Sequence, residues 1–168
     1  MGRIIKMALS TAYFAGGAYL GYIGHPIFMS ILLVLGSIMT YSIIRHGSVA
    51  LAMKALEKQD NEKARKYLNE TFNVKWLSSA YKAFYYMVDG YILTAGGLRN
   101  EAIISYEFAL QHKIKRDEDK AIMLFQLSML YADKGNIAKS RILLKSSKDL
   151  EPKGQLLDQI KKFEKRIR

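Results

Sequence analysis

The sequence contains no cysteine. Disulfide bonds, thiolate metal sites and cysteine nucleophiles are therefore excluded. Charge is missing from one long stretch, since the 38 residues from Met7 to Ile44 include no Asp, Glu, Lys or Arg. All 15 acidic residues come after that stretch. This uneven distribution predicts a membrane-embedded part followed by a soluble part.

The usual signatures of catalysis are also absent. The three histidines, at positions 25, 46 and 112, are far apart and lack metal-ligand spacing. The glycine pairs Gly16-Gly17 and Gly96-Gly97 are not followed by the Gly-Lys-Ser/Thr of a phosphate-binding loop, and no Gly-x-Ser-x-Gly occurs. We therefore expect a non-enzymatic protein with no catalytic residues, no cofactor, no metal and no small-molecule substrate.

The uncharged stretch is too long for one membrane helix. At about 1.5 Å per residue it would be nearly twice as long as the roughly 30 Å hydrocarbon layer is thick. Its middle is Gly24-His25-Pro26, and glycine and proline favour a turn. Residues 1–46 are therefore predicted to form a transmembrane hairpin, with helices at about 6–23 and 27–44.

The flanking charges predict how this hairpin is oriented. Arg3 and Lys6 precede the first helix, Arg45 follows the second, and the connecting loop has no Lys or Arg. Because basic residues favour the cytoplasmic side, we expect an integral membrane protein with two spans and both termini in the cytoplasm, in a bacterial inner membrane. A cleaved signal peptide fits less well, because a second apolar helix follows at once. A buried hairpin in a soluble protein is an alternative, but the remaining chain looks too small to cover it.

Small residues recur along the predicted membrane helices. Such rows allow two helices to approach closely. We expect them to pack the two helices of the hairpin together, or alternatively to receive a partner's transmembrane helix. The predicted packing residues are Ala8, Ala12, Gly16, Gly17, Gly21 and Gly36.

The soluble part contains an internal repeat. Its clearest copy carries apolar, small and aromatic residues on one predicted helix, a turn glycine at Gly135, small residues on a second helix, and a final proline at Pro152. This pattern resembles a tetratricopeptide repeat. The residues that carry the resemblance are Leu124, Leu127, Ser128, Tyr131, Gly135, Ser140, Leu144, Ser147 and Pro152.

Two weaker copies come earlier, each 38 residues before the next. In the middle copy Asp89 replaces an apolar residue, and the first copy lacks the turn glycine and the proline. The spacing exceeds the family's usual length of about 34 and suggests longer helices. The matching positions are Tyr86, Gly90, Leu93, Gly97, Ala102, Tyr106 and Ala109, and, before them, Leu51, Ala52, Ala55, Ala64, Leu68 and Thr71.

The resemblance implies an all-α fold in which a three-repeat α-solenoid follows the hairpin. The helix pairs are expected at about 47–73, 76–112 and 116–151, within residues 47–152. Residues 153–168 are predicted to form a basic amphipathic capping helix, because a stack of repeats needs a polar-faced end. Its apolar stripe comprises Leu156, Leu157, Ile160, Phe163 and Ile167.

The family binds partners mainly along a concave face lined by the first helix of each repeat. Here that face would be apolar and rich in methionine, which favours a hydrophobic helix or an extended peptide as ligand. Alternatively, the capping helix fills the face. The predicted partner-binding residues are Met53, Phe84, Met87, Val88, Tyr91, Phe125 and Met129.

The soluble part is strongly basic. From His46 onward it carries 23 Lys and Arg against 15 Asp and Glu, a net charge of +8. Membrane lipid, nucleic acid and acidic proteins are the partners that such a charge favours. Trp76 and the tyrosines that follow it are predicted to pack in the core, with base stacking as the alternative.

Our main expectation is a membrane-anchored protein-interaction scaffold that serves as an accessory or assembly subunit of a membrane complex. One alternative is a basic membrane-surface module that recruits ribosomes or nucleic acid, although nucleic acid is the less favoured partner. Another is a chaperone-like receptor for translocating polypeptides.

Overall fold

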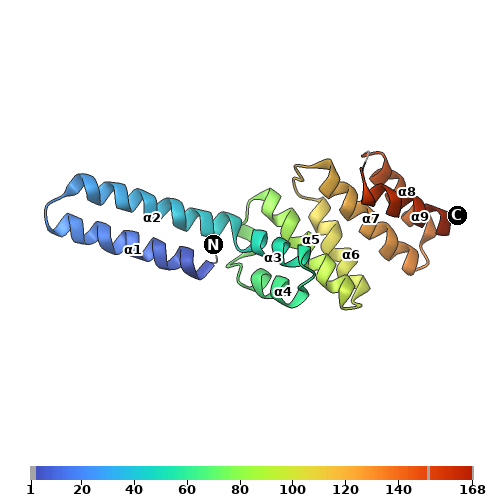
Figure 1. Cartoon of the computed structure of the whole chain (residues 1–168), viewed down its shortest axis with the longest axis horizontal. Helices are drawn as coiled ribbons and strands as arrows, with labels where there is room; N and C mark the ends of the chain where they lie inside the picture. The colour runs from blue at the N-terminus through green and yellow to red at the C-terminus, as the bar shows by residue number, and fades with distance from the viewer. Residues whose placement is uncertain (1–2, 151, 168) are drawn as a thin grey trace. The chain divides into compact units, whose positions relative to one another are not determined.

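A computed structural model of the chain describes residues 3–150 and 152–167. Within this part the secondary structure consists of nine α-helices and one short 3₁₀ helix, with no strand (Figure 1). The all-α fold class is thereby confirmed. The chain divides into two compact units, Met1–Tyr81 and Lys82–Arg168.

The first unit begins with two antiparallel helices, α1 (Arg3–Tyr22) and α2 (Pro26–His46), which lie side by side (Figure 1). The turn between them contains Gly24 at a φ of +83°, a left-handed conformation that glycine adopts without strain. Pro26 then occupies the first position of α2, where its missing N–H removes no helical hydrogen bond. The break at Gly24-His25-Pro26 therefore has local physical causes.

A short helix pair completes the first unit. α3 (Val49–Glu57) begins only two residues after α2 ends, and α4 (Asn61–Asn69) is capped by Asp60, whose carboxylate accepts the backbone N–H of Lys63 at 2.9 Å. Both helices have nine residues, so the expectation of longer helices is wrong for this pair. The added residues lie in the connection at positions 70–78, which contains the 3₁₀ helix η1 (Val74–Trp76).

The second unit continues with four more helices after α5 (Ser79–Ala95). They are α6 (Arg99–Leu110), α7 (Asp117–Asp133), α8 (Ile137–Lys148) and α9 (Gln155–Arg166). Gly97 and Gly135 make the turns after α5 and α7, at φ angles of +76° and +79°. In the first unit Gln59 is in the equivalent place, 38 residues before Gly97, and adopts a φ of +59° without being glycine.

Small side chains let α7 and α8 approach closely. Ser128 and Ser140 are fully buried, and the Ser128 hydroxyl donates to the Ser140 carbonyl at 2.9 Å. Further along, Ser147 donates to the Ala121 carbonyl at 2.8 Å. The Ser140 hydroxyl lies 3.1 Å from that of Ser128, so each of the three buried hydroxyls has a hydrogen-bond partner.

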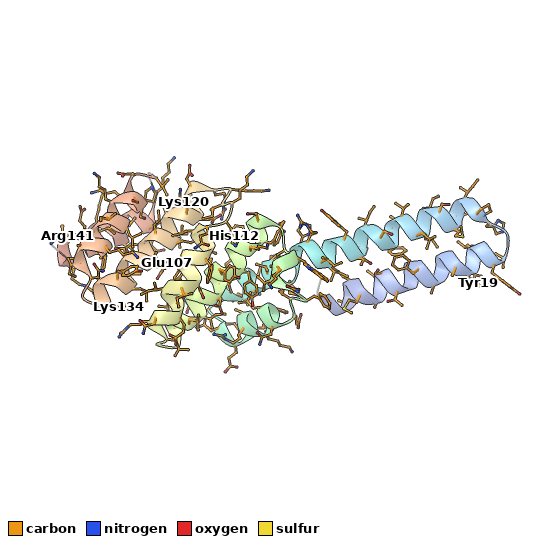
Figure 2. All side chains as sticks on the ribbon, turned by 180° about the vertical axis from the view of Figure 1, so that it is seen from behind. Tyr19, Glu107, His112, Lys120, Lys134 and Arg141 are labelled. Carbon is orange, nitrogen blue, oxygen red and sulfur yellow. The ribbon has the colours of Figure 1, made fainter. Side chains whose placement is uncertain are left out.

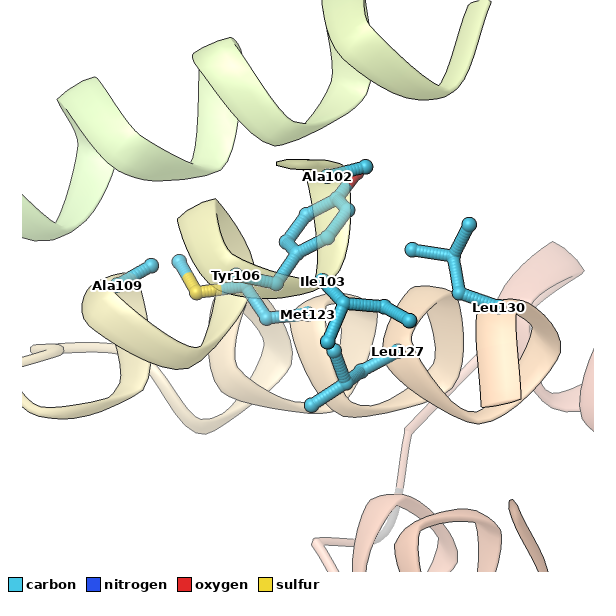
Figure 3. Close-up of a cluster of buried hydrophobic side chains, with 7 residues drawn as sticks. All are labelled: Ala102, Ile103, Tyr106, Ala109, Met123, Leu127 and Leu130. Carbon is cyan, nitrogen blue, oxygen red and sulfur yellow. The ribbon is translucent and has the colours of Figure 1, made fainter. Parts of the chain in front are cut away.

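The core of the second unit lies between α6 and α7 (Figure 3). Tyr106 and Met123, which are 1% and 0% exposed, fill its centre. A second apolar cluster joins α9 to α7 and α8 through Phe125, Leu144 and Ile160. In these clusters α6 packs against α7, and α9 packs against both α7 and α8. The first cluster comprises Ala102, Ile103, Tyr106, Ala109, Met123, Leu127 and Leu130.

Candidate membrane and partner-binding surfaces

The outer surface of α2 is almost entirely apolar. Gly36 is the one buried residue of this helix, and many of its large side chains are exposed, whereas Met29, Leu32 and Leu33 lie toward α1. The helix is long and apolar enough to cross a membrane, and among the described helices no other meets both criteria. The outward-facing side chains, between 50% and 74% exposed, are Ile27, Phe28, Ile31, Val34, Ile38 and Tyr41.

α1 is less apolar than α2, although it also exposes large hydrophobic side chains. It contains Lys6, Ser10 and Thr11 and three tyrosines, which lower its average hydropathy. Tyr19 is 65% exposed and points away from the helix pair (Figure 2). Its other exposed apolar and aromatic residues include Ile5, Met7, Leu9, Phe14 and Tyr22.

The contact between α1 and α2 combines glycines with a pair of hydroxyl groups. The hydroxyl oxygens of Ser10 and Thr40 are 2.7 Å apart, and both also lie within hydrogen-bonding distance of the Gly36 carbonyl, at 3.3 and 2.9 Å. A Cβ added at Gly17 or Gly21 would lie 3.3 Å from Leu33 or 2.6 Å from Met29. These glycines therefore permit the close approach of the two helices.

The predicted row of small residues needs a correction at its start. Ala8 and Ala12 are exposed and lie outside the contact with α2. At 100° per residue, each is about 200° around the helix from Ser10, which faces α2. Gly16, Gly17, Gly21 and Gly36 do lie against the opposite helix, where added Cβ atoms would meet neighbouring side chains. The contact thus follows Ser10, Phe14, Gly17 and Gly21 at helical spacing.

Part of the predicted partner-binding face is closed. Val88 is fully buried and Phe125 is 3% exposed. The Phe125 ring packs edge-on against Phe163 of α9, with ring centroids 5.8 Å apart. At this position α9 covers a residue of the predicted face, which agrees with the alternative interpretation.

The other predicted residues are more accessible. Tyr91 is 39% exposed, and Phe84, Met87 and Met129 are half-buried. Met53, also half-buried, belongs to the first unit and the other six to the second. Beside Met129 lies a groove of about 440 Å³ between α7 and α9, lined by Phe125, Gln126, Met129, Gln159, Lys162, Phe163 and Arg166.

An aromatic pair lies in the connection after α4. Trp76 is 49% exposed and Phe72 61% exposed, and their ring centroids are 5.4 Å apart. The prediction that Trp76 packs in the core is therefore wrong. Because the residue follows a helix and precedes an aromatic run, sequence pattern alone gave no signal that it lies on the surface.

The titratable groups of the second unit that are described next take part in contacts within and between its helices. Tyr131 donates to Glu107 at 2.7 Å and Lys139 lies 3.0 Å from the same carboxylate oxygen, joining α6, α7 and α8 (Glu107 is labelled in Figure 2). The hydrogen bond from Tyr131, with Lys139 nearby, lowers the pKa of Glu107. Burial raises the pKa of the Tyr106 hydroxyl well above its ordinary range, so it stays neutral.

The described part of the chain contains no cluster of side chains that could hold a metal ion. No group of three or more His, Asp or Glu side chains converges there. His112 stacks on Tyr86 with ring centroids 6.0 Å apart, and its pKa is lowered by burial and by Lys82. These contacts place His112 in the packing of the second unit.

Comparison with known proteins gives no further assignment. No family model, no curated protein and no solved structure matches the chain.

Proposed function

We propose that this chain is a membrane-anchored protein-interaction scaffold, an accessory or assembly subunit of a membrane complex. In this proposal both α1 and α2 cross the bilayer, and the helix pairs form a cytoplasmic tetratricopeptide-like domain capped by α9. The observation that carries it is the outward-facing apolar surface of α2. Such side chains are unfavourable in water but are the normal surface of a helix in lipid.

Three features support a second span by α1. α1 has 20 residues, about 30 Å of helix, which matches the thickness of the hydrocarbon layer. The Ser10 hydroxyl is paired with that of Thr40, so no unsatisfied polar group is left on this side of α1. Its two basic residues, Arg3 and Lys6, belong to its first four positions, near the membrane surface that long basic side chains can reach.

The absence of cysteine makes this topology directly testable. Single-cysteine variants Gly2→Cys, His25→Cys and Lys153→Cys would be treated in sealed vesicles with a membrane-impermeant maleimide. We expect Gly2→Cys and Lys153→Cys to react from one side and His25→Cys from the other. Labelling of Gly2→Cys and His25→Cys from the same side would overturn the second span.

The accessible partner-binding surface is the groove between α7 and α9. Its floor, at Phe125 and Met129, is apolar, whereas Lys162 and Arg166 line its edge. An apolar partner segment with acidic flanks fits this chemistry, because the methionine adapts to irregular shapes and the cations attract carboxylates. Phe84, Met87 and Tyr91 of α5 are proposed to extend the partner-binding face.

Cross-linking and purification in mild detergent test this role. A stoichiometric partner should co-purify with the full-length protein and should be lost when Met129 is changed to Glu. Ile142→Lys is the control, because Ile142 is 67% exposed on α8, away from the groove lining. Recovery of the chain without any partner would count against a scaffold.

The basic charge favours a second candidate, a module that recruits an anionic partner such as the ribosome. A cavity of about 480 Å³ between α8 and α9 is lined by three basic side chains and two carboxylates, namely Arg141, Lys145, Lys148, Asp149 and Glu164. Binding through such groups should weaken steeply as salt rises. Association that persists at high salt would instead favour the apolar groove.

A further inference from the structure

An uncharged pocket lies at the end of the α1–α2 pair where α2 meets the rest of the first unit. Its volume is about 360 Å³, and it combines residues of both long helices with the aromatic pair of the connection at 70–78. No side chain in its lining carries a charge. The lining residues are Met7, Ser10, Thr11, Thr40, Ile43, Ile44, Phe72 and Trp76.

The aromatic pair is fixed in place by its backbone. The Ser78 N–H donates to the Arg45 carbonyl at 2.9 Å, and the Arg45 guanidinium donates to the Trp76 carbonyl at 3.3 Å. Between these two bonds, Leu77 is 1% exposed and so anchors the segment in the first unit. Trp76 and Phe72 are therefore held at a fixed position along the axis of α2, although their rings remain exposed.

The position of Trp76 and Phe72 along α2 coincides with the end of the apolar surface of that helix. Ile43 and Ile44 are the last apolar residues of the helix, and Arg45 follows them directly. Lys75, next to Trp76, is exposed, and Lys6 lies one residue before Met7 of the pocket. Apolar lining, aromatic rings and cations thus succeed one another over a short distance, as they do at the boundary between acyl chains and headgroups.

We propose that this pocket binds the upper acyl-chain region of a membrane phospholipid, with Trp76 and Phe72 at the boundary between hydrocarbon and headgroups. The proposal rests on the membrane anchoring proposed above. Arg45 and Lys75 then face the lipid phosphate, to which their cationic groups are suited. The connection at 70–78 becomes a second membrane contact of the first unit, separate from the helices that cross the bilayer.

The chain contains a single tryptophan, so its fluorescence reports on this pocket alone. The full-length protein would be reconstituted in phosphatidylcholine vesicles whose acyl chains are brominated either near the headgroup or near the chain end. We expect Trp76 to lose most of its emission with the shallow bromines, less with the deep ones, and little on adding iodide to the water. Protection from iodide without quenching by either brominated lipid would show burial in protein and would overturn the proposal.

A second reporter separates this proposal from the one on which it rests. Val34, near the middle of α2, is 57% exposed, so a Val34→Trp variant in a Trp76→Phe background should be quenched most by the deep bromines. Quenching of that reporter with none of Trp76 would overturn the lipid pocket and leave the span intact. No quenching of either reporter would overturn membrane insertion itself.

Discussion

The ring of Tyr106 lies directly against Gly90, because a Cβ at position 90 would be 3.0 Å from two of its carbon atoms. Tyr106 is 1% exposed and packs in the core between α6 and α7, so it has little room to move. Gly90 therefore sets the distance between α5 and α6. The close approach depends on the absence of a side chain rather than on backbone freedom, since Gly90 lies in the middle of a helix.

Enlarging Gly90 should destabilise the second unit. Gly90→Val is expected to lower the free energy of unfolding by about 1–3 kcal/mol, the usual range for overpacking a core. Thermal unfolding of the detergent-solubilised protein, followed by circular dichroism, measures the change. Gly96→Val is the control, since a Cβ there would meet only ordinary contacts at 3.5 Å. An equal loss in both variants would contradict the close packing at Gly90.

Replacing Gln59 with glycine should stabilise the first unit. Its φ of +59° is strained for a residue with a side chain, by roughly 1 kcal/mol. Gln59→Gly is therefore expected to raise the melting temperature of the first unit, which spans 81 residues, by roughly 4–8 °C. The reverse change, Gly135→Gln, should destabilise the second unit, because Gly135 has a φ of +79° and open space around its Cβ position. If both changes shift stability in the same direction, the turn geometry is not the cause.

The repeat pattern explains how much of the fold can be predicted from sequence. Gly97 and Gly135 identify two turns, because only glycine adopts a positive φ without strain. Ser128 and Ser140 mark a close helix contact by their small size. The connection at 70–78, by contrast, has no periodic pattern, so the exposed position of Trp76 could not be predicted from spacing alone.

The facing hydroxyls of Ser10 and Thr40 predict a specific cross-link. Because their oxygens are 2.7 Å apart, the sulfurs of a Ser10→Cys, Thr40→Cys double variant should form a disulfide on mild oxidation. The chain has no other cysteine, so intact mass measures the bond without interference. Ala12→Cys paired with Thr40→Cys should stay reduced, since Ala12 is exposed on the other side of α1. A bond in the second pair but not the first would contradict the helix contact.

Glu107 should make a small, pH-dependent contribution to stability. Its pKa is lowered in the folded protein by the hydrogen bond from Tyr131, so its contribution is present above the ordinary pKa of 4.5 and is lost as the pH falls through the folded value. The Glu107 and Lys139 side chains are about two-fifths exposed, which limits the contribution to below about 1 kcal/mol.

Glu107→Gln should accordingly lower the melting temperature at neutral pH, and the difference from the wild type should disappear in acid. Unfolding curves over this pH range measure it. Glu57→Gln, an exposed change at the end of α3, serves as the control and should show little effect at any pH. A difference that grows on acidification would contradict the lowered pKa.

The packing of α9 against α7 predicts a large effect of one aromatic residue. Phe163 is 6% exposed and packs against Phe125 of α7. Phe163→Ala should lower the free energy of unfolding by about 3–5 kcal/mol, because it leaves a cavity among three helices. Chemical denaturation measures this loss. Ile142→Ala, at a residue 67% exposed on α8, should change stability by no more than about 0.5 kcal/mol.

The predicted partner-binding face shows why a site is harder to predict than a fold. Phe125 and Met129 occupy positions where an apolar residue can either contact a ligand or pack against α9. The apolar stripe of α9 indicates that the cap is amphipathic, but its spacing does not specify which neighbouring residues it covers. Burial of Phe125 beneath Phe163 decides that question at one position only.

Only two residues link α2 to α3, so the two helices have little freedom to rotate independently of each other. Gly47 turns the chain at a φ of +57°, and a Cβ there would lie 3.0 Å from Thr71 and 3.2 Å from Leu77. The rotation of α2 about its own axis therefore determines the direction in which α3 and α4 project. Adding one residue within α2 would rotate α3 and α4 by about 100° about the axis of α2. Adding seven residues would nearly restore their original orientation.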